Sequence, residues 1–228
     1  MFIEQSMSRK VITINPEAGI LEAKEKMRRY QFHSLPVIDA DRILVGIVTD
    51  RDVRSAWPSD LFSEEETLRQ KERCAQLKIK DIMTADPVTV SPANTLQDAL
   101  LQMQRINVGA LPVVDRDRKV VGIITLRDLL RTFTGVLGID EPGMLLGIVA
   151  DDQQGQMKRI VDAITEEKIR FGSILVSRYW EEGKRAFFPY LFTHNVIQLK
   201  KKLEALGFTF INPLEWYLRD QPSKIEKT

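Results

Sequence analysis

One stretch of the sequence occurs twice, and this duplication constrains the fold more than any other feature. The heptapeptide GIVTDRD at residues 46–52 returns as GIITLRD at residues 122–128. The same offset of 76 holds without a gap from Met7 against Met83 to Val53 against Leu129, and 18 of these 47 positions are identical. Because repetition at one fixed period marks a structural unit built more than once, the sequence predicts a duplicated module followed by a tail of different character.

Each copy of the repeat predicts the element order strand, helix, strand, strand, helix. In the first copy these are a β-branched strand at 11–14, a helix with Ile20, Ala23, Met27 and Tyr30 on one face, strands at 34–38 and 43–48, and a helix at 49–56. In the second copy they are a strand at 88–90, a helix with Leu96, Ala99, Leu100, Met103 and Ile106 on one face, strands at 110–114 and 120–124, and a helix at 126–133. The nearly uninterrupted apolar run at 43–48 predicts a strand that is buried on both sides.

The tail predicts a third domain with the order strand, helix, strand, strand, helix, strand. Its strands are expected at 144–150, 171–179, 185–192 and 208–211, and its helices turn Met157, Ile160, Val161 and Ile164, then Val196, Leu199, Leu203 and Leu206 inward. We therefore place repeat 1 at 1–57, a linker helix at 58–80, repeat 2 at 81–133, a linker with several glycines at 134–143, the third domain at 144–219 and a frayed polar tail at 220–228.

Composition narrows the class of protein. The 228 residues carry 33 basic and 32 acidic side chains, a net charge of +1, and 43% of the residues are hydrophobic. This describes a globular protein with a real core, and it favours neither nucleic acid nor a membrane surface as a partner. One cysteine, Cys74, excludes an intramolecular disulfide and fits a reducing compartment. The sequence has no run of about 18 apolar residues and does not start with an apolar signal segment, so we expect a cytoplasmic protein.

Three motifs carry a resemblance to a known family. They are Leu-Pro-Val-[Ile/Val]-Asp at 35–39 and 111–115, Val-Gly-Ile-[Val/Ile]-Thr-x-Arg-Asp at 45–52 and 121–128, and a leading Met-[Ser/Thr] at 7–8 and 83–84 with a later Thr-[Ile/Val]-x-Pro at 13–16 and 89–92. The duplicated unit resembles the CBS domain, and the pair resembles a Bateman module over about residues 1–133. The tail looks like an ACT-type domain, and the combination resembles a bacterial family of acetoin-utilisation regulators.

The resemblance implies both a fold and a function. The fold is α+β, with tandem βαββα CBS domains followed by a βαββαβ ferredoxin-like domain whose sheet is antiparallel. The function is a regulatory protein without catalysis or a required cofactor, which senses an adenosine-containing ligand such as AMP, ADP or ATP, forms a homodimer and acts on an unknown target. Two alternatives stay open: a structural or adaptor protein with empty clefts, and an accessory subunit or undetected enzyme of small-carbon, acetoin-type metabolism.

The spacing Thr-x-x-Asp at 49–52 and 125–128 has two interpretations. It is the spacing of a helix capping box, in which the Thr oxygen accepts from an orphan N–H and the acid reaches back, here with Asp in place of the usual Glu or Gln. It also suits nucleotide binding, because a carboxylate at this place can accept from the two vicinal hydroxyls of a ribose and helix N–H groups can meet a phosphate. The residues alone allow either.

The resemblance carries ligand-binding roles onto matching positions in both copies. These are Thr13, His33, Ser34, Leu35, Pro36, Thr49, Arg51 and Asp52 in repeat 1, and Thr89, Ala110, Leu111, Pro112, Thr125, Arg127 and Asp128 in repeat 2. Each cleft lies between repeats, so one site can draw on both. The arginines pair either with phosphate or with neighbouring acids, and His33 either reaches a phosphate or packs at the surface. Because His33-Ser34 stands where repeat 2 has Gly109-Ala110, the two clefts are not equivalent.

The loop after the first strand of the third domain is a second candidate site. ACT-type relatives often bind an amino acid there across a dimer interface, and Asp151, Asp152 and Gly155 occupy that loop. Gln154 stands where such relatives often carry proline, which leaves an assembly role as the alternative. Catalysis has little support, because the sequence contains no nucleophile elbow, phosphate-binding loop or metal-ligand cluster.

Overall fold

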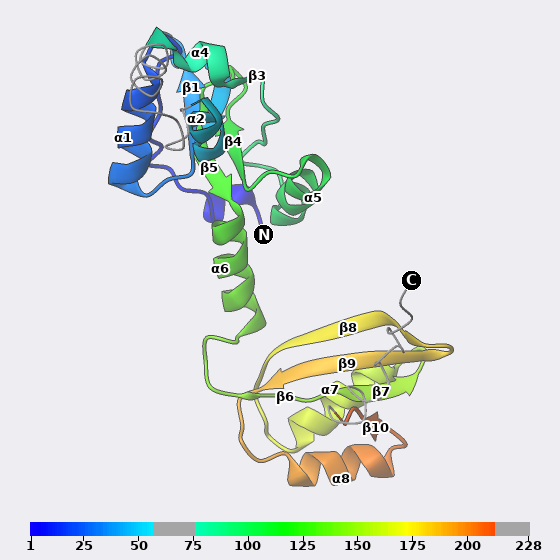
Figure 1. The fold of residues 1–228 in the computed structure, drawn as a ribbon. Coiled ribbons are helices and arrows are strands. Elements are labelled where there is room, and N and C mark those ends of the chain that lie inside the picture. The colour runs from blue at the N-terminus through cyan, green and yellow to red at the C-terminus, as the bar shows by residue number, and fades with distance from the viewer. Residues whose placement is uncertain (57–75, 213–228) are drawn as a thin grey trace, which may run out of the picture. The chain divides into compact units, whose positions relative to one another are not determined.

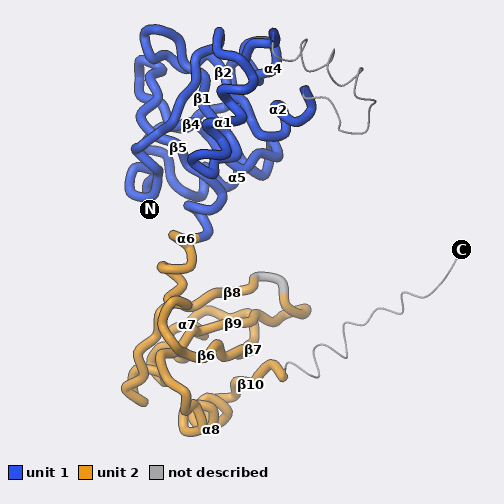
Figure 2. The backbone as a smooth tube through the Cα atoms, turned by 60° about the vertical axis from the view of Figure 1, so that its left-hand side comes forward, with its two compact units in different colours: residues 1–130 blue, residues 131–228 orange. Residues whose placement is uncertain are grey.

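The computed structural model of this chain describes residues 1–56 and 76–212, except for the side chains of Arg178 and Tyr179. The expected linker helix therefore lies largely outside the described residues, as do Cys74 and the expected polar tail. The chain forms two compact units, residues 1–130 and 131–228 (Figure 2). Within the described residues no helix is long and apolar enough to cross a membrane.

The first unit contains both copies of the repeat (Figure 1). Repeat 1 forms α1 (Ile20–Tyr30), the antiparallel hairpin β1 (Ser34–Ile38) and β2 (Leu44–Thr49), and α2 (Asp50–Ala56). Repeat 2 forms α5 (Leu96–Ile106), the hairpin β4 (Ala110–Val114) and β5 (Val120–Thr125), and α6 (Leu126–Leu137). The helix and hairpin expectations are confirmed in both copies, and α6 runs four residues beyond its expected end at Phe133.

The leading strands are different from the expectation. Only Ile14 and Val90 pair at these places, each in a single parallel bridge, to Val37 and Val113 respectively. A proline follows two residues after each bridge, at Pro16 and Pro92, and proline cannot donate to a strand ladder. The run therefore ends before a second pair can form.

Burial inside the repeats follows the expected helix faces only in part. Ile20, Ala23 and Met27 of α1 are buried, and so are Leu96, Ala99 and Met103 of α5. Tyr30, Leu100 and Ile106, which were expected on the inner faces, are exposed instead. The expectation that the strand at 43–48 is buried on both sides is also wrong, because buried and half-buried residues alternate along β2.

The segment that precedes each repeat packs on the other repeat. Residues 77–85 form α4 (Ile79–Ile82) and β3 (Thr84–Ala85), and β3 pairs with β2 of repeat 1, Gly46 facing Ala85. Ile79 lies in the core of repeat 1 and its N–H donates to the carbonyl of Ala18 at 2.9 Å. In the same way the N-terminal 3-10 turn η1 (Ile3–Gln5) packs on repeat 2, where Ser8 bridges Ile123.

Two glycines allow this exchange of segments. A Cβ at Gly46 would lie 3.1 Å from the carbonyl oxygen of Thr84 and nearer still to Sδ of Met83. A Cβ at Gly122 would meet Sδ of Met7 at 2.5 Å. The backbone of β2 and β5 must approach the exchanged segment this closely, and only glycine leaves the room.

The second unit has one antiparallel sheet and two helices. Its elements are β6 (Met144–Leu145), β7 (Ile148–Asp151), α7 (Gln156–Glu166), β8 (Phe171–Glu181), β9 (Lys184–Leu191), α8 (Ile197–Ala205) and β10 (Thr209–Phe210). The strand order is β10, β7, β9, β8, and every neighbouring pair is antiparallel. Short β6 pairs with β9 along the same line as β7. The single strand expected at 144–150 is divided into β6 and β7, and the other elements follow the order expected from the sequence.

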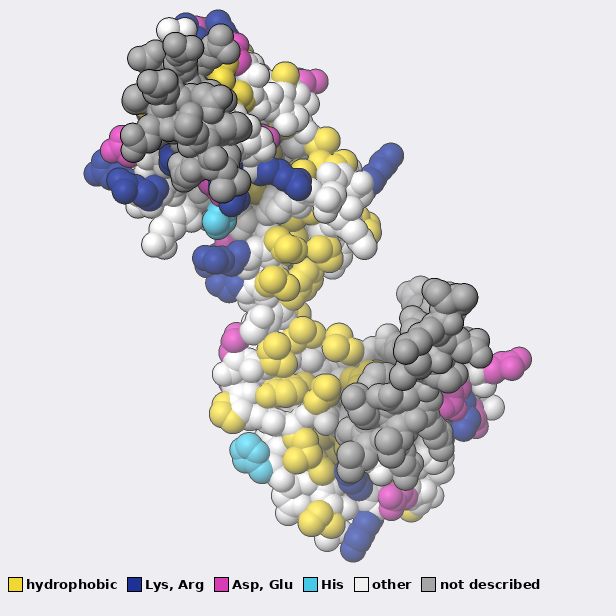
Figure 3. Space-filling view, viewed as in Figure 1, with side chains coloured by type: hydrophobic (Ala, Val, Ile, Leu, Met, Phe, Trp, Pro, Cys, Tyr) yellow, Lys and Arg dark blue, Asp and Glu magenta, His cyan; other side chains and the backbone are white. Residues whose placement is uncertain are grey.

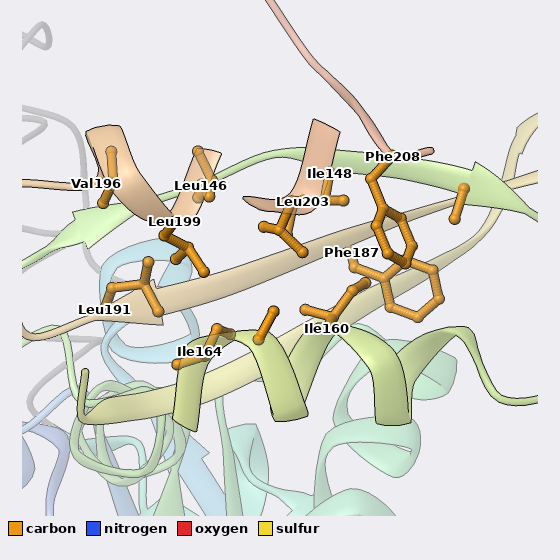
Figure 4. Packing of buried hydrophobic residues seen from close by; sticks show 12 residues of the cluster. Leu146, Ile148, Ile160, Ile164, Phe187, Leu191, Val196, Leu199, Leu203 and Phe208 are labelled. Carbon is orange, nitrogen blue, oxygen red and sulfur yellow. The ribbon is translucent and has the colours of Figure 1, made fainter. Parts of the chain in front are cut away.

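The core of this unit lies between the sheet and its helices (Figure 4). Side chains of β7 and β9, such as Ile148, Phe187 and Leu191, meet those of α7 and α8, such as Ile160 and Leu203. The expected helix stripes are confirmed at their centres. Met157 and Leu206, at the two ends of those stripes, are exposed.

Candidate functional site

The strand-to-helix corner of repeat 1 is a closed capping box. Thr49 ends β2 and α2 starts at the next residue. The N–H and Oγ1 of Thr49 donate to Oδ2 of Asp52 at 2.8 and 2.7 Å, and the Asp52 N–H donates back to Oγ1 at 3.3 Å. The capping interpretation is thus realised, and it fixes the carboxylate at the corner.

The corner of repeat 2 repeats this geometry. Thr125 donates through its N–H at 3.0 Å and its hydroxyl at 2.6 Å to Oδ2 of Asp128, which donates its own N–H back at 3.2 Å. Asp128 is buried, whereas Asp52 is half-buried.

A third capping box shows that this geometry alone does not mark a ligand site. At the start of α5, Thr95 and Asp98 make the same three hydrogen bonds at 2.8, 2.8 and 3.1 Å. Hydrogen bonds from the Thr95 backbone and hydroxyl hold the pKa of Asp98 below its usual range. Asp98 was not among the expected site residues, so it serves as an internal reference for Asp52.

One carboxylate oxygen at the first corner remains available. Both hydrogen bonds that Asp52 accepts end on Oδ2. No fully buried side-chain oxygen or nitrogen of the described residues lacks a hydrogen-bond partner, so Oδ1 of the half-buried Asp52 has at least some contact with solvent. An open carboxylate oxygen on a fixed side chain is a strong hydrogen-bond acceptor for a hydroxyl group.

The other expected site residues of repeat 1 gather at the same corner. Ser34 faces Thr49 across the hairpin, and the Asp50 N–H donates to the His33 carbonyl at 2.9 Å. The Ile14 N–H donates to the Pro36 carbonyl at 3.1 Å, which places Thr13 beside the strand. Leu35 is completely buried, so its backbone rather than its side chain is left to meet a ligand.

Repeat 2 assembles its own set in the same way. Ala110 faces Thr125, and the Leu126 N–H donates to the Gly109 carbonyl at 2.9 Å. The Val90 N–H donates to the Pro112 carbonyl at 3.1 Å, which places Thr89 next to the strand. Leu111 is buried like its counterpart in repeat 1.

The two hairpins also contact each other directly, at their turn ends. The Leu44 N–H donates to the Arg118 carbonyl at 3.1 Å, and Ile43 bridges Lys119. These residues lie at the opposite end of the strands from Thr49 and Thr125. A site that draws on both repeats therefore remains a prediction.

The charged groups at the two corners are not the same. Arg51 and Arg127 are exposed, and among the described residues neither forms an ion pair. In repeat 1, Arg54 Nη2 lies 2.6 Å from Asp50 Oδ2, an i,i+4 ion pair on α2. Repeat 2 has leucines at both of these positions, 126 and 130. The expected inequality of the two corners thus extends beyond His33.

The candidate amino-acid loop lies where β7 leads into α7. Asp151 ends β7 opposite Lys184, and the Asp152 carboxylate pairs with the Arg185 guanidinium. Gly155 caps α7 with a φ of 88°, in the left-handed region that glycine adopts readily. The turn is formed as expected, and one of its two acids is already paired.

The structure also has two surface pockets whose linings contain none of the expected site residues, although Ser91, Pro92 and Asp115 of the second pocket belong to the repeat motifs. Sequence reasoning missed both pockets because it assigned no binding role to any residue of their linings. One, of about 500 Å³, is in the second unit and is lined by Glu167, Lys168, Ile169, Arg170, Phe192, Thr193, Asn195, Gln198 and Leu199. The other, of about 480 Å³, is lined by Phe2, Glu4, Gln5, Ser91, Pro92, Ala93, Asp115 and Arg116.

Comparison with known proteins matches the first unit. The family model described as CBS domain matches residues 3–59 and 79–135. A CBS domain-containing protein of Dictyostelium discoideum is 35% identical over 137 residues, covering 60% of this chain and 94% of the relative. An inosine-5'-monophosphate dehydrogenase of Korarchaeum cryptofilum is 40% identical over 126 residues, which is 55% of this chain but only 23% of that enzyme.

Solved structures match over the same part of the chain. The CBS domain pair of protein MJ0100, in complex with 5'-methylthioadenosine and S-adenosyl-L-methionine, is 29% identical with a TM-score of 0.50, and the match covers 59% of this chain and 97% of that one. CBSX2 in complex with AMP is 27% identical with a TM-score of 0.50, over 58% and 95%. An acetoin utilization protein (AcuB) from Vibrio cholerae is 27% identical with a TM-score of 0.51, over 62% and 98%.

Proposed function

Because this chain belongs to the CBS-domain family, we propose that it is a regulatory protein whose CBS pair senses an adenosine-containing ligand. The observation that carries the proposal is the corner of repeat 1, where Thr49 holds the Asp52 carboxylate through Oδ2 alone and leaves Oδ1 in contact with solvent. Two solved CBS proteins at 27–29% identity hold AMP, or 5'-methylthioadenosine with S-adenosyl-L-methionine. The dehydrogenase relative matches only over its CBS part, which favours a regulatory module over a catalytic one.

The chemistry of the corner suits a nucleoside. A ribose hydroxyl would donate to Oδ1 of Asp52, because Oδ2 is already held by Thr49. Adenine would lie along the strand backbone at Ser34-Leu35-Pro36, and the exposed guanidinium of Arg51 would meet a phosphate. Asp128, Ala110-Leu111-Pro112 and Arg127 would play the same parts in repeat 2. No cofactor is required by this proposal.

Ligand binding is tested by thermal unfolding of protein that has been stripped by denaturation and refolded. The panel is AMP, ADP, ATP, 5'-methylthioadenosine and S-adenosyl-L-methionine. A ligand at a hundredfold over its Kd should stabilise the fold by about 2.7 kcal/mol, which is roughly 5–10 °C for a chain of this length. No shift with any of the five would refute the sensing proposal and favour an adaptor with empty clefts.

The carboxylate is tested by Asp52→Asn and Asp128→Asn, with Asp98→Asn as the matched control. All three residues close capping boxes of the same geometry. Each should lose less than about 1 kcal/mol of stability, as for other cap changes. Only a corner variant should lose ligand affinity as well, by roughly 1.5–3 kcal/mol, the worth of a hydrogen bond to a charged group. If all three variants bound the ligand with equal affinity, the carboxylates at the two corners would serve only as helix caps.

We propose further that the second unit is an ACT-type domain with a ferredoxin-like fold. Its element order and its antiparallel strand order β10, β7, β9, β8 support this. Asp151, Asp152 and Gly155 would then form an amino-acid site, to be tested by calorimetry with the twenty amino acids and an Asp151→Asn variant. The acetoin utilization protein among the similar structures supports a role in acetoin-type metabolism through an unidentified target.

We also propose a homodimer with two-fold symmetry, the commonest form of soluble oligomer. Light scattering should give twice the 26.2 kDa of the chain. The apolar helix faces of the two repeats are the candidates for this contact, with Ile20, Met27 and Tyr30 in repeat 1 and Leu96, Met103 and Ile106 in repeat 2. Ile20, Met27, Leu96 and Met103 are buried inside their own repeats, whereas Tyr30 and Ile106 are exposed.

A further inference from the structure

The pocket of the second unit lies between two loops at one end of its sheet. One loop follows α7 and leads into β8, and the other follows β9 and leads into α8 (Figure 1). The two loops are joined where the Phe192 N–H donates to the Arg170 carbonyl at 2.9 Å. The candidate amino-acid loop, residues 151–155, precedes α7, whereas the pocket lining begins at Glu167, directly after the last residue of α7. The pocket is therefore separate from that loop, at the other end of the helix.

Two basic side chains of the lining, Lys168 and Arg170, are available to a ligand. Lys168 is exposed and forms no ion pair among the described residues. Arg170 lies over the Phe192 ring, with Cζ 5.3 Å from the ring centroid, and this contact holds the guanidinium at the pocket. Glu141 approaches Arg170 to 3.5 Å, but both side chains are largely exposed, so this ion pair is weak and a ligand can replace it.

The acidic residue of the lining, Glu167, already has a positive partner. Lys202 places its Nζ atom 3.1 Å from Oε1 of Glu167 and 2.6 Å from Oε2 of Glu166. Hydrogen bonds with Glu166 and then Glu167 raise the pKa of Lys202 above its ordinary value, so the lysine stays charged. Because Lys202 balances Glu167, the pocket keeps the net positive charge of its two available basic side chains.

Neutral side chains complete the lining. Thr193 contributes a hydroxyl group, and Asn195 and Gln198 contribute amide groups, all of which can donate to an oxygen atom. The side-chain oxygen of Asn195 accepts the Ile197 N–H at 3.1 Å, which leaves the amide NH₂ group for a ligand. Phe192 adds an apolar wall. The volume of about 500 Å³ is typical of a site for a small organic molecule and exceeds what a single inorganic ion needs.

Basic charge is otherwise dispersed over the visible face of the second unit. On that face Lys and Arg side chains of the described residues stand apart from one another (Figure 3). The net charge of the whole chain is only +1. Unspecific attraction of anions comes from a high net charge or a broad basic surface, so the sharing of one concave site by Lys168 and Arg170 is the feature that points to a particular ligand.

We propose that this pocket binds a small organic anion in which a carboxylate or phosphate group is attached to a short carbon skeleton. Lys168 and Arg170 would hold the oxygens of the anionic group, because hydrogen bonds from ammonium and guanidinium groups to carboxylate or phosphate are strong. The Gln198 amide would donate to a further oxygen, and the Phe192 ring would pack on the carbon skeleton. This site goes beyond the proposed adenosine sensing, which belongs to the first unit.

Amide NMR titration of the full chain tests the proposal with two probes, succinate and glycerol 3-phosphate. At least one of them should shift resonances at 167–170 and 192–198, and the one that binds identifies the anionic group as carboxylate or phosphate. Glycerol and added sodium chloride are the controls for the skeleton and for ionic strength, and neither should shift these resonances.

Two results of the titration would overturn the proposal. The first is the absence of any shift in the pocket with either probe up to about 10 mM, well above a Kd of about 1 mM. The second is a set of shifts confined to residues 151–155, which would place the anion at the candidate amino-acid loop instead.

Three variants then test which residues hold the anion. Lys168→Gln removes a cation from the pocket, and Gln198→Glu adds a negative charge with almost no change of shape; both residues are exposed, so the fold should be retained. Each should raise the Kd of the probe about tenfold or more, since a hydrogen bond to a charged group is lost or like charges meet. Lys201→Gln is the matched control, because Lys201 is exposed on α8 and lies outside the lining.

The control separates the pocket from the overall charge of the chain. Lys201→Gln changes the net charge by the same amount as Lys168→Gln and should leave the Kd nearly unchanged. If it weakened binding as much as Lys168→Gln, the affinity would follow net charge and the assignment of the pocket would be wrong. Unchanged affinity in both pocket variants, with their other amide resonances in place, would refute the assignment as well.

Discussion

Replacing Gly46 with alanine tests the close approach between β2 and the exchanged segment. The added Cβ would lie 3.1 Å from Cγ of Met83 and 3.1 Å from the carbonyl oxygen of Thr84, with the Met83 sulfur closer still. The thioether can turn away, but the carbonyl is held by the pairing of β2 with β3. The substitution must therefore push the two strands apart or force Met83 out of its position.

The magnitude follows from two opposing effects. Overpacking of a well-packed site costs about 1–3 kcal/mol. Replacing glycine with alanine also restricts the unfolded chain, which stabilises by about 0.4–1 kcal/mol where the backbone allows it. The net expectation for Gly46→Ala is a loss of about 1–2 kcal/mol. Gly122→Ala, facing Met7, should behave alike.

Urea unfolding followed by circular dichroism measures the effect, and Gly109→Ala is the matched control. No atom lies within 4 Å of a Cβ built at Gly109, so its alanine variant should be neutral or slightly more stable. The double variant Gly46→Ala with Met83→Ala should recover about 1 kcal/mol of coupling free energy. If Gly46→Ala proved as stable as Gly109→Ala, or if the coupling were zero, the reasoning from close approach would be wrong.

Two further predictions concern ion pairs and cation–π contacts. Hydrogen bonds and charges from Lys78 and Lys80 lower the pKa of Glu17 from its ordinary 4.5 to about 2. Because the pKa of Glu17 is lower in the folded chain than in the unfolded chain, its ion pairs stabilise the fold above the unfolded pKa, and this contribution is lost as the pH falls through about 2. Carboxyl NMR titration should show this value, and Lys80→Met should raise it; an unchanged value would contradict the pairing. In the second unit, Arg159 lies 4.9 Å over the Phe208 ring and donates to the Leu206 carbonyl at 2.6 Å. Arg159→Met should therefore lower the free energy of unfolding by about 1–2 kcal/mol, and an unaffected urea midpoint would contradict it.

The sequence was a good guide wherever local signals agree with one another. The hairpins follow from Leu-Pro-Val and Val-Gly-Ile flanking a turn, and the capping boxes follow from Thr-x-x-Asp, because both depend on contacts within a few residues. The third domain's element order also follows from its periodicity and turns. The amphipathic stripes of the repeats hold in most positions but fail at their ends, where Tyr30 and Ile106 are exposed, and at Leu100 within α5.

The exchanged segments could not be predicted from the repeat. Self-alignment places Met7 with the repeat that follows it, whereas the chain places it against Gly122. The spacing of the repeats in the sequence does not show which copy a segment packs on, since both copies have a glycine at the contact position. The differences at the candidate site were partly visible, at His33 against Gly109. The ion pair of Asp50 with Arg54 needed only a comparison of the two corners.

The exchange has a consequence for how this half of the chain could be divided. Cutting between residues 57 and 75 would yield one fragment that retains η1 and Met7, which repeat 2 needs, and another that retains β3 and Met83, which repeat 1 needs. Neither fragment contains a complete repeat, so each would complement the other rather than fold by itself. An ancestral chain with a single repeat would have needed this segment from a second chain to complete its fold. Duplication within one chain would have supplied the segment from the same chain.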